Sequence, residues 1–172
     1  MSVQEECSEL FLQDVVRVDI MPAAALMIGV PFNVPDAAVA QVTMSNGDPL
    51  TDASLFAASL LSMNTGYDGQ ADAVMQEGVT HKVAERNDAI GMVRTHTLQV
   101  TVETGSDAVR GKEAGLHGAY FHIILTTVDG TRYLAYGLPN TCQFSIDDQL
   151  GGTVRMTVRA VLQSMSGMIK IE

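Results

Sequence analysis

The chain has 172 residues, 47% of them hydrophobic, and it carries twenty Asp or Glu against ten Lys or Arg, for a formal net charge of −10. This length suits one hydrophobic core, so we expect a single domain over residues 1–172. The acidic excess argues against direct sequence-specific binding of nucleic acid and against attachment to anionic membranes, because both use basic surfaces.

The acidic residues are concentrated in the first half of the chain. Residues 1–90 contain thirteen Asp or Glu and three basic residues, whereas residues 91–172 contain seven of each. A surface of one sign keeps a protein soluble, repels DNA or faces a basic partner, and the sequence leaves these alternatives open.

The sequence predicts a protein that is made in the cytoplasm and is not inserted into a membrane. The first ten residues, MSVQEECSEL, place acidic residues where a secretory signal has Lys or Arg. The longest apolar stretch, Ile20 to Phe32, contains two prolines and is shorter than the roughly 20 residues that span a bilayer. Cys7 and Cys142 are the only cysteines, and we expect no disulfide between them in a reducing compartment.

The first predicted strand runs from Val16 to Ile20, because apolar residues alternate there with Arg17 and Asp19. It stops at Met21-Pro22. The next local signal is Asn46-Gly47, a pair that readily adopts positive φ and therefore predicts a turn.

A single helix is predicted after this turn, with Thr51 or Asp52 as its N-cap. The apolar residues from Leu55 to Met63 are too crowded for strand alternation and fit a helical stripe, which Asn64-Thr65-Gly66 ends. We expect this helix to pack on a sheet.

A long hairpin is predicted in the middle of the chain. The alternation from Thr97 to Glu103 is that of a strand with one solvent-facing side, and Val79 to Ala84 alternates more weakly. Val79 to Glu103 is therefore expected to form a hairpin with its tip near Glu85–Asp88. No apolar cluster lies near the tip, and a hairpin that projects from a domain usually reaches a partner.

Asp129-Gly130 is the clearest hairpin signal, because this dipeptide is typical of a type I′ turn. Tyr120–Val128 should then pair with Thr131–Leu138. The predicted pairs on one face are Phe121–Leu138, Ile123–Tyr136, Leu125–Leu134 and Thr127–Arg132. The opposite face is half apolar, so we expect it to be partly covered too.

The last part of the chain predicts three more strands. Thr153–Gln163 alternates almost without fault, and Cys142–Ile146 is expected to pair with it across a turn at Gly151-Gly152. Met168–Ile171 is expected to form a short final strand.

Together these elements predict a mainly β (α+β) protein, an antiparallel β-sandwich or barrel with one flanking helix and a long hairpin. The polar, glycine-containing segments Tyr67–Gly78 and Gly105–Gly118 are predicted loops, with room for a turn of helix in each. No repeat of fixed period is present, which excludes solenoids and propellers.

The segment Gly105–Glu113 invites comparison with a phosphate-binding loop. Five residues separate Gly105 from Gly111 where the motif has four, and Glu113 stands where the motif needs Ser or Thr for magnesium. An ordinary surface loop is the better interpretation.

The four histidines do not have the spacing of a zinc site. His117 and His122 are five residues apart, which places them on opposite faces of a strand, and neither cysteine is near another ligand in the sequence. His96 and His122 are interpreted as strand residues near a sheet surface.

No constellation for covalent or acid–base catalysis is recognisable. The sequence has no G-x-S-x-G motif, and Cys142 enters a predicted strand as an inert thiol. Asp147-Asp148 is interpreted as a solvated pair in a turn. We therefore expect no catalytic, cofactor-binding or metal-binding residues and no cofactor. The ten methionines fit core gaps or an interface with a neighbouring subunit, as for Met165 and Met168.

The arrangement of elements resembles the tail-tube and neck proteins of tailed phages. The resemblance rests on the hairpin Val79–Glu103, the sheets formed by Tyr120–Leu138 and Thr153–Gln163, and the helix Asp52–Met63. It implies rings of small β-sandwich or barrel subunits, in which the hairpin reaches the next subunit and an acidic lumen lets DNA slide.

Three hypotheses for function follow. The first is a non-enzymatic structural protein that assembles with copies of itself and with other structural proteins into a ring or tube, as a virion tail or connector component. The alternative is an intracellular β-sandwich module that binds a small ligand or peptide in a concave apolar pocket. The third is an enzyme whose polar groups converge from distant segments.

Overall fold

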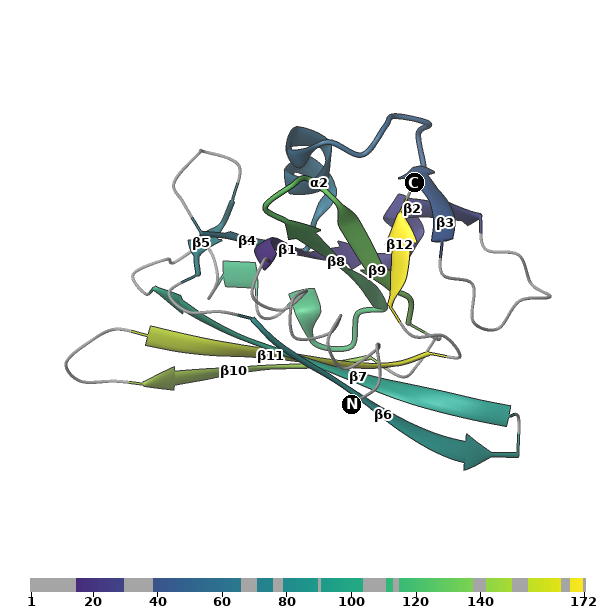
Figure 1. Cartoon of the computed structure of the whole chain (residues 1–172). Coiled ribbons are helices and arrows are strands. Elements are labelled where there is room, and N and C mark those ends of the chain that lie inside the picture. The colour runs from purple at the N-terminus through teal and green to yellow at the C-terminus, as the bar shows by residue number, and fades with distance from the viewer. Residues whose placement is uncertain are drawn as a thin grey trace.

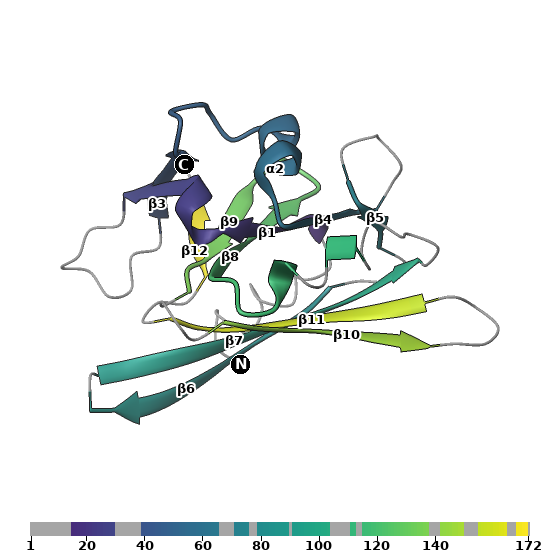
Figure 2. The same cartoon turned by 180° about the vertical axis from the view of Figure 1, so that it is seen from behind.

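The protein is described from a computed structural model, which defines residues 15–29, 39–65, 71–75, 79–89, 91–103, 111–112, 115–137, 142–149, 155–164 and 168–171. Two antiparallel sheets face each other, and one short helix covers the far side of the larger sheet (Figures 1 and 2). The mainly β class and the sandwich architecture are therefore confirmed.

The larger sheet has eight strands in the order β2-β3-β12-β9-β8-β1-β4-β5. Its pairs are antiparallel except β12–β3 and β4–β5, which are parallel. The strands are β1 (Val15–Pro22), β2 (Leu26–Gly29), β3 (Val39–Met44), β4 (Leu61–Asn64), β5 (Ala73–Val74), β8 (Phe121–Thr127), β9 (Arg132–Ala135) and β12 (Ile169–Ile171). A 3₁₀ turn, η1 (Ala23–Ala25), connects β1 to β2.

The smaller sheet has four strands in the order β10-β11-β7-β6, all antiparallel. Its strands are β6 (Thr80–Asp88), β7 (Gly91–Glu103), β10 (Gln143–Gln149) and β11 (Arg155–Ser164). Strand β7 is thirteen residues long and pairs with β11 over one side and with β6 over the other.

The main core lies between the two sheets, and strand alternation explains how it forms. In β11, Met156, Val158, Ala160 and Leu162 are each at most 1% exposed, while Arg159 between them is exposed. The facing residues of the larger sheet include Val18, Ile20, Leu61, Met63, Phe121, Ile123 and Leu125. Full burial of one such aliphatic side chain contributes roughly 1.5–3 kcal/mol, so this alternation is what holds the sheets together.

A second core lies on the other face of the larger sheet, beneath the helix α2 (Asp52–Ala58) and the β2–β3 hairpin. Leu55 of α2 is fully buried there beside Ile124 of β8 and Leu134 of β9. Every residue of β8 is buried, which confirms that both faces of this strand are covered.

The helix begins as predicted but is shorter. Thr51 is the N-cap: its side chain accepts a hydrogen bond from the Ser54 backbone N–H, and the Ser54 hydroxyl accepts one from Thr51 N–H. The helix ends at Ala58, so the expected continuation to Met63 is wrong. Residues 61–64 form β4 instead, and its first three residues are all buried. A strand covered on both faces shows no alternation, which is why the sequence resembled a helical stripe.

The β8–β9 hairpin exists, but its predicted register is wrong by one residue. Leu125 lies opposite Tyr133 rather than Leu134. The Thr127 backbone N–H bonds to Thr131 O, and Gly130 N–H bonds to Thr127 O, so the loop has three residues. Gly130 has φ of 89°, as expected for a type I turn followed by a left-handed residue rather than for a two-residue type I′ turn.

The other predicted strands are found with small changes of length. Residues 85–88 belong to β6 rather than to a turn, since Asp88 pairs with Gly91, so the hairpin tip lies farther out than expected.

Part of the predicted loop at 67–78 forms β5, and Met75 bridges to Val102. Asp147-Asp148 lies within β10 and not in a turn. The predicted turn at 151–152, Cys7 and Met165 lie outside the described residues.

Candidate functional site

The most exposed regular element is the outer half of the β6–β7 hairpin. Figures 1 and 2 show the two strands running past the end of the sandwich, away from the eight-stranded sheet. Residues 82–87 are all exposed, and two of the exposed apolar side chains lie here, Val83 at 41% and Met92 at 39%. Arg94 Nε lies 3.1 Å from Glu85 Oε1, and this exposed ion pair stiffens the hairpin only slightly.

Strand β6 is also an edge of its sheet. In the described part of the chain, only β7 pairs with it, and the other edge of the same sheet is β10. Among the described strands β6 therefore forms a sheet edge nine residues long, and an edge strand is the usual template for pairing with another chain.

A histidine pair lies near the base of the hairpin. His81 Nε2 and His96 Nδ1 are 3.0 Å apart, and the rings stack with centroids at 5.2 Å. His96 is fully buried, contrary to the expectation of a surface position. Burial, together with the neighbouring His96, lowers the pKa of His81 to about 4, so the His81 ring is neutral at pH 7.

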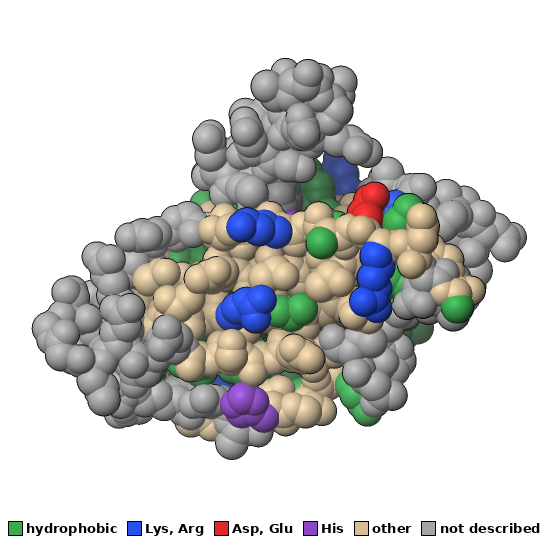
Figure 3. Space-filling model, turned by 90° about the horizontal axis from the view of Figure 1, so that it is seen from below, with side chains coloured by type: hydrophobic (Ala, Val, Ile, Leu, Met, Phe, Trp, Pro, Cys, Tyr) green, Lys and Arg blue, Asp and Glu red, His purple; other side chains and the backbone are tan. Residues whose placement is uncertain are grey.

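The face of the four-stranded sheet that points away from the core is polar (Figure 3). By strand alternation its described charged side chains are Lys82, Arg86 and Arg159, and Figure 3 also shows a carboxylate near one edge of this view. Cationic side chains therefore predominate among the described charges of this face.

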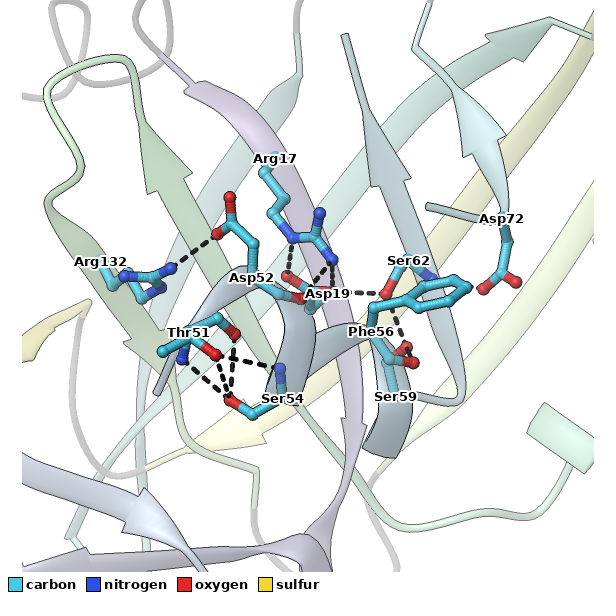
Figure 4. A network of polar contacts seen from close by, with 10 residues as sticks. All are labelled: Arg17, Asp19, Thr51, Asp52, Ser54, Phe56, Ser59, Ser62, Asp72 and Arg132. Carbon is cyan, nitrogen blue, oxygen red and sulfur yellow. Dashed lines mark hydrogen bonds and ion pairs between the residues drawn. The ribbon is translucent and has the colours of Figure 1, made fainter. Parts of the chain in front are cut away.

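A buried polar network lies on the opposite side of the molecule, between α2 and the larger sheet (Figure 4). Arg17 Nε and Asp19 Oδ2 are 2.8 Å apart, and both residues are at most 1% exposed. The Ser62 hydroxyl donates to Asp19 Oδ1 at 2.5 Å. Burial raises the pKa of Asp19 above its ordinary value, while the Arg17 guanidinium opposes this shift.

The network continues to both ends of the helix region. Arg132 Nη2 donates to Asp52 Oδ1 at 2.7 Å, and Arg17 Nη2 donates to the Asp52 backbone carbonyl at 3.3 Å. At the other end, Asp72 Oδ2 accepts from the Ser62 backbone N–H at 2.9 Å and from Lys112 Nζ at 2.8 Å. The sequence patterns did not indicate this network. The one signal that could have revealed it is the pair of opposite charges, Arg17 and Asp19, two residues apart on a predicted strand.

His122 and Cys142 lie near each other but are not arranged for catalysis. His122 Nδ1 accepts the Gly137 backbone N–H at 2.9 Å, and its ring stacks on Tyr136 at 4.7 Å. Burial lowers the pKa of His122 to about 4. Burial raises the pKa of the Cys142 thiol, and that thiol exchanges hydrogen bonds with the Phe121 backbone. A protonated thiol bonded to backbone is a poor nucleophile.

The remaining residues considered as metal or phosphate ligands do not come together in a binding site within the described part of the chain. No group of three or more His, Cys, Asp or Glu with metal-binding geometry occurs in the described ranges. Of the phosphate-loop-like segment, only Gly111 and Lys112 are described, and the Lys112 ammonium is bound to Asp72. Among the same ranges, no helix is long and apolar enough to cross a bilayer.

A shallow hollow of about 510 Å³ lies on the α2 side of the molecule. It is lined by β3, the residues before α2, the β8–β9 turn and β12, and its charged side chains are Asp129, Arg132 and Lys170. Its apolar lining includes Val42, Leu50 and Ile171, so it is a mixed surface rather than an apolar cup.

The fold and these features define a two-sheet β protein with a projecting edge hairpin. No family model, curated protein or solved structure matches the chain.

Proposed function

We propose that this protein is a non-enzymatic structural subunit that assembles with copies of itself into a ring or tube, of the kind used in phage tails and connectors. The observation that carries the proposal is the nine-residue edge strand β6 in a hairpin whose outer half is exposed. Such an edge is a liability in a monomer, and natural proteins usually shorten or cover it.

The strand order supports a repeating contact. Strands alternate in direction across β10-β11-β7-β6, so β10 of a second copy placed beside β6 in the same orientation continues the antiparallel order. A contact between two different edges is heterologous, and heterologous contacts repeat until they close a ring or extend a filament. The exposed Val83 and Met92 provide apolar area on the hairpin that a neighbouring copy can bury.

The assembly is tested with a charge variant of the hairpin. Val83→Glu combined with Met92→Glu should convert large species of the wild type into monomers, because an unpaired buried carboxylate costs at least ~3 kcal/mol, or ~100-fold in Kd. The matched control is Val128→Glu, at a 71% exposed apolar position on the β8–β9 turn, which should assemble as the wild type does.

Mass by light scattering after size exclusion, followed by negative-stain images, measures the result. The proposal expects wild-type masses at whole multiples of 18.4 kDa together with rings or tubes. At a protein concentration where the wild type is also monomeric, urea unfolding of the double variant should match that of the wild type, since both positions are exposed in the monomer. A wild type that stays monomeric at every concentration contradicts the proposal.

A second candidate function is a β-sandwich module that binds a small ligand or peptide. The hollow between β3, β12 and the β8–β9 turn supports it, because the cationic Arg132 and Lys170 line it together with the apolar Val42, Leu50 and Ile171. This candidate becomes the leading one if the wild type is a monomer and a carboxylate-bearing ligand raises its Tm.

A further inference from the structure

The hollow on the α2 side of the molecule lies where strand β12 ends inside the larger sheet. Strand β12 sits between β3 and β9 (Figure 1), and its last residue, Ile171, pairs with Ala40 of β3 and with Arg132 of β9. Beyond these pairs β3 continues to Met44, whereas β9 gives way to the β8–β9 turn. The hollow is therefore bounded by β3 and by this turn, with the end of β12 between them.

The dimensions of the hollow are those of one missing stretch of strand. Neighbouring strands lie about 4.8 Å apart, so the two strands that flank β12 are about 9.5 Å apart. Residues 41–44 of β3 run past the end of the β12 pairing and extend over about 13 Å, at about 3.3 Å per residue. The gap in the sheet has the width of one strand and the length of a short extended peptide.

Strand β3 turns backbone hydrogen-bonding groups toward this gap. The Ser45 N–H donates to Ala25 O, on the side of β2. Backbone groups alternate in direction along a strand, so the N–H and C=O of Val42 and Met44 point away from β2. The Met44 N–H accordingly donates to Asp48 O, and the Val42 groups face the gap, where the described β12 pairing has already ended.

The two faces of the gap differ in polarity. Its lining on the α2 side includes Val42, Leu50 and Ile171, which belong to the second core or pack against it. Lys170 precedes Ile171 in β12, so its side chain lies on the opposite face of the sheet, where it is exposed. An extended peptide in the gap is therefore expected to turn apolar side chains toward α2 and acidic side chains toward Lys170.

The other charged side chains of the lining already have partners. Arg132 donates to Asp52, and the Asp129 carboxylate accepts from the Thr131 backbone N–H and the Thr127 hydroxyl. The ion pairs among the described residues do not include Lys170. Lys170 is thus the cation of the lining that can attract an acidic side chain of a ligand.

We propose that this gap binds an extended peptide segment of another polypeptide chain by strand addition, in line with β12 and beside β3. The segment pairs with the Val42 backbone and alternates apolar with acidic residues, because main-chain bonds give such sites affinity and alternate side chains give them specificity. The inference rests on the second candidate function, to which it gives a defined class of ligand. The ring proposed above uses edges of the other sheet, so its failure leaves this site untouched.

A labelled hexapeptide of alternating glutamate and valine tests the mode of binding by fluorescence anisotropy with the full chain. Two further forms are methylated on the valine nitrogens or on the glutamate nitrogens. Alternate N–H groups of a strand face the same neighbour, so one methylated form should lose at least about tenfold in affinity and the other should keep most of it.

Two outcomes of this experiment overturn the proposal. The first is no saturable binding of the unmodified peptide up to about 1 mM. The second is equal binding of all three forms, with displacement by glutarate at the same concentration, which indicates a site for small carboxylates in place of strand addition.

Charge variants locate the site on the protein. Lys170→Glu should weaken binding of the unmodified peptide several-fold, because repulsion of its carboxylates replaces attraction. Arg159→Glu is the matched control, since it makes the same reversal of charge at an exposed position on the other sheet, and it should bind as the wild type does. Urea unfolding checks that both variants are folded. Equal affinities of the two variants overturn the proposal.

Discussion

At the scale of single residues, the buried Arg17–Asp19 pair makes the sharpest prediction for stability. Asp19→Asn leaves the Arg17 charge buried without its counter-ion, and removing one partner of a buried pair typically costs about 3–5 kcal/mol. We expect the urea midpoint to fall accordingly with an unchanged m value.

The exposed pair of the hairpin is the natural control. Glu85→Gln breaks an ion pair whose Glu85 side chain is 54% exposed, so the free energy of unfolding should change by less than about 1 kcal/mol. If Asp19→Asn and Glu85→Gln lowered the free energy of unfolding equally, the burial of the Arg17–Asp19 pair would not explain the loss of stability. The double change Arg17→Met with Asp19→Leu should recover most of the loss, because no unpaired charge remains.

The pair His81–His96 predicts a loss of stability in mild acid. The pKa of His81 is lowered in the folded protein from 6.5 to about 4. The unfolded chain therefore takes up this proton first, and the contribution of His81 to stability is present above about pH 6.5 and lost as pH falls toward 4, at about 1.4 kcal/mol per unit.

The His81→Gln variant tests this assignment. Its free energy of unfolding should fall less steeply than that of the wild type between these pH values, because the shifted group is gone. His117→Gln, at an exposed position, serves as the control substitution of a second histidine. Parallel curves for His81→Gln and the wild type would contradict the assignment.

At the scale of elements, the start of α2 is set by local chemistry. Thr51→Ala removes the capping box with Ser54 and should destabilise the protein by about 1 kcal/mol. Thr51→Ser keeps the capping oxygen and should restore stability in urea unfolding. If Thr51→Ser is as unstable as Thr51→Ala, the methyl group rather than the cap is responsible.

The two hairpins show how much of an element can be predicted from its own residues. The positions of β6–β7 and β8–β9 follow from alternation, which is a local property. Their turns do not, because the same Asp129-Gly130 pair suits a two-residue or a three-residue loop. In the folded protein Asp129 accepts bonds from Thr127 and Thr131, which favours the longer loop and slips the register by one.

At the scale of the whole molecule, the two sides of the sandwich differ in chemistry. One side carries the edge hairpin and a polar sheet face with the cationic side chains Lys82, Arg86 and Arg159. The other side carries α2, the buried polar network and the mixed hollow. The proposed assembly through the β6 and β10 edges would leave the α2 side available for other contacts.

Composition and alternation by themselves determined the β class, the capped start of α2 and most of the described strands. These properties depend on residues close together in the chain, so the order of apolar and polar residues is sufficient to predict them. The fold class follows because alternating strands must bury one face against another sheet.

Only the tertiary structure decided which charges are buried and which strands are edges. Arg17 and Asp19 look like the wet face of a strand in the sequence, and they are buried because α2 covers that face. His96 is likewise buried in the folded protein. Strand β4 was mistaken for helix in the sequence because distant segments cover both faces of this strand. Burial and edge position depend on contacts between residues far apart in the chain, and no local pattern contains that information.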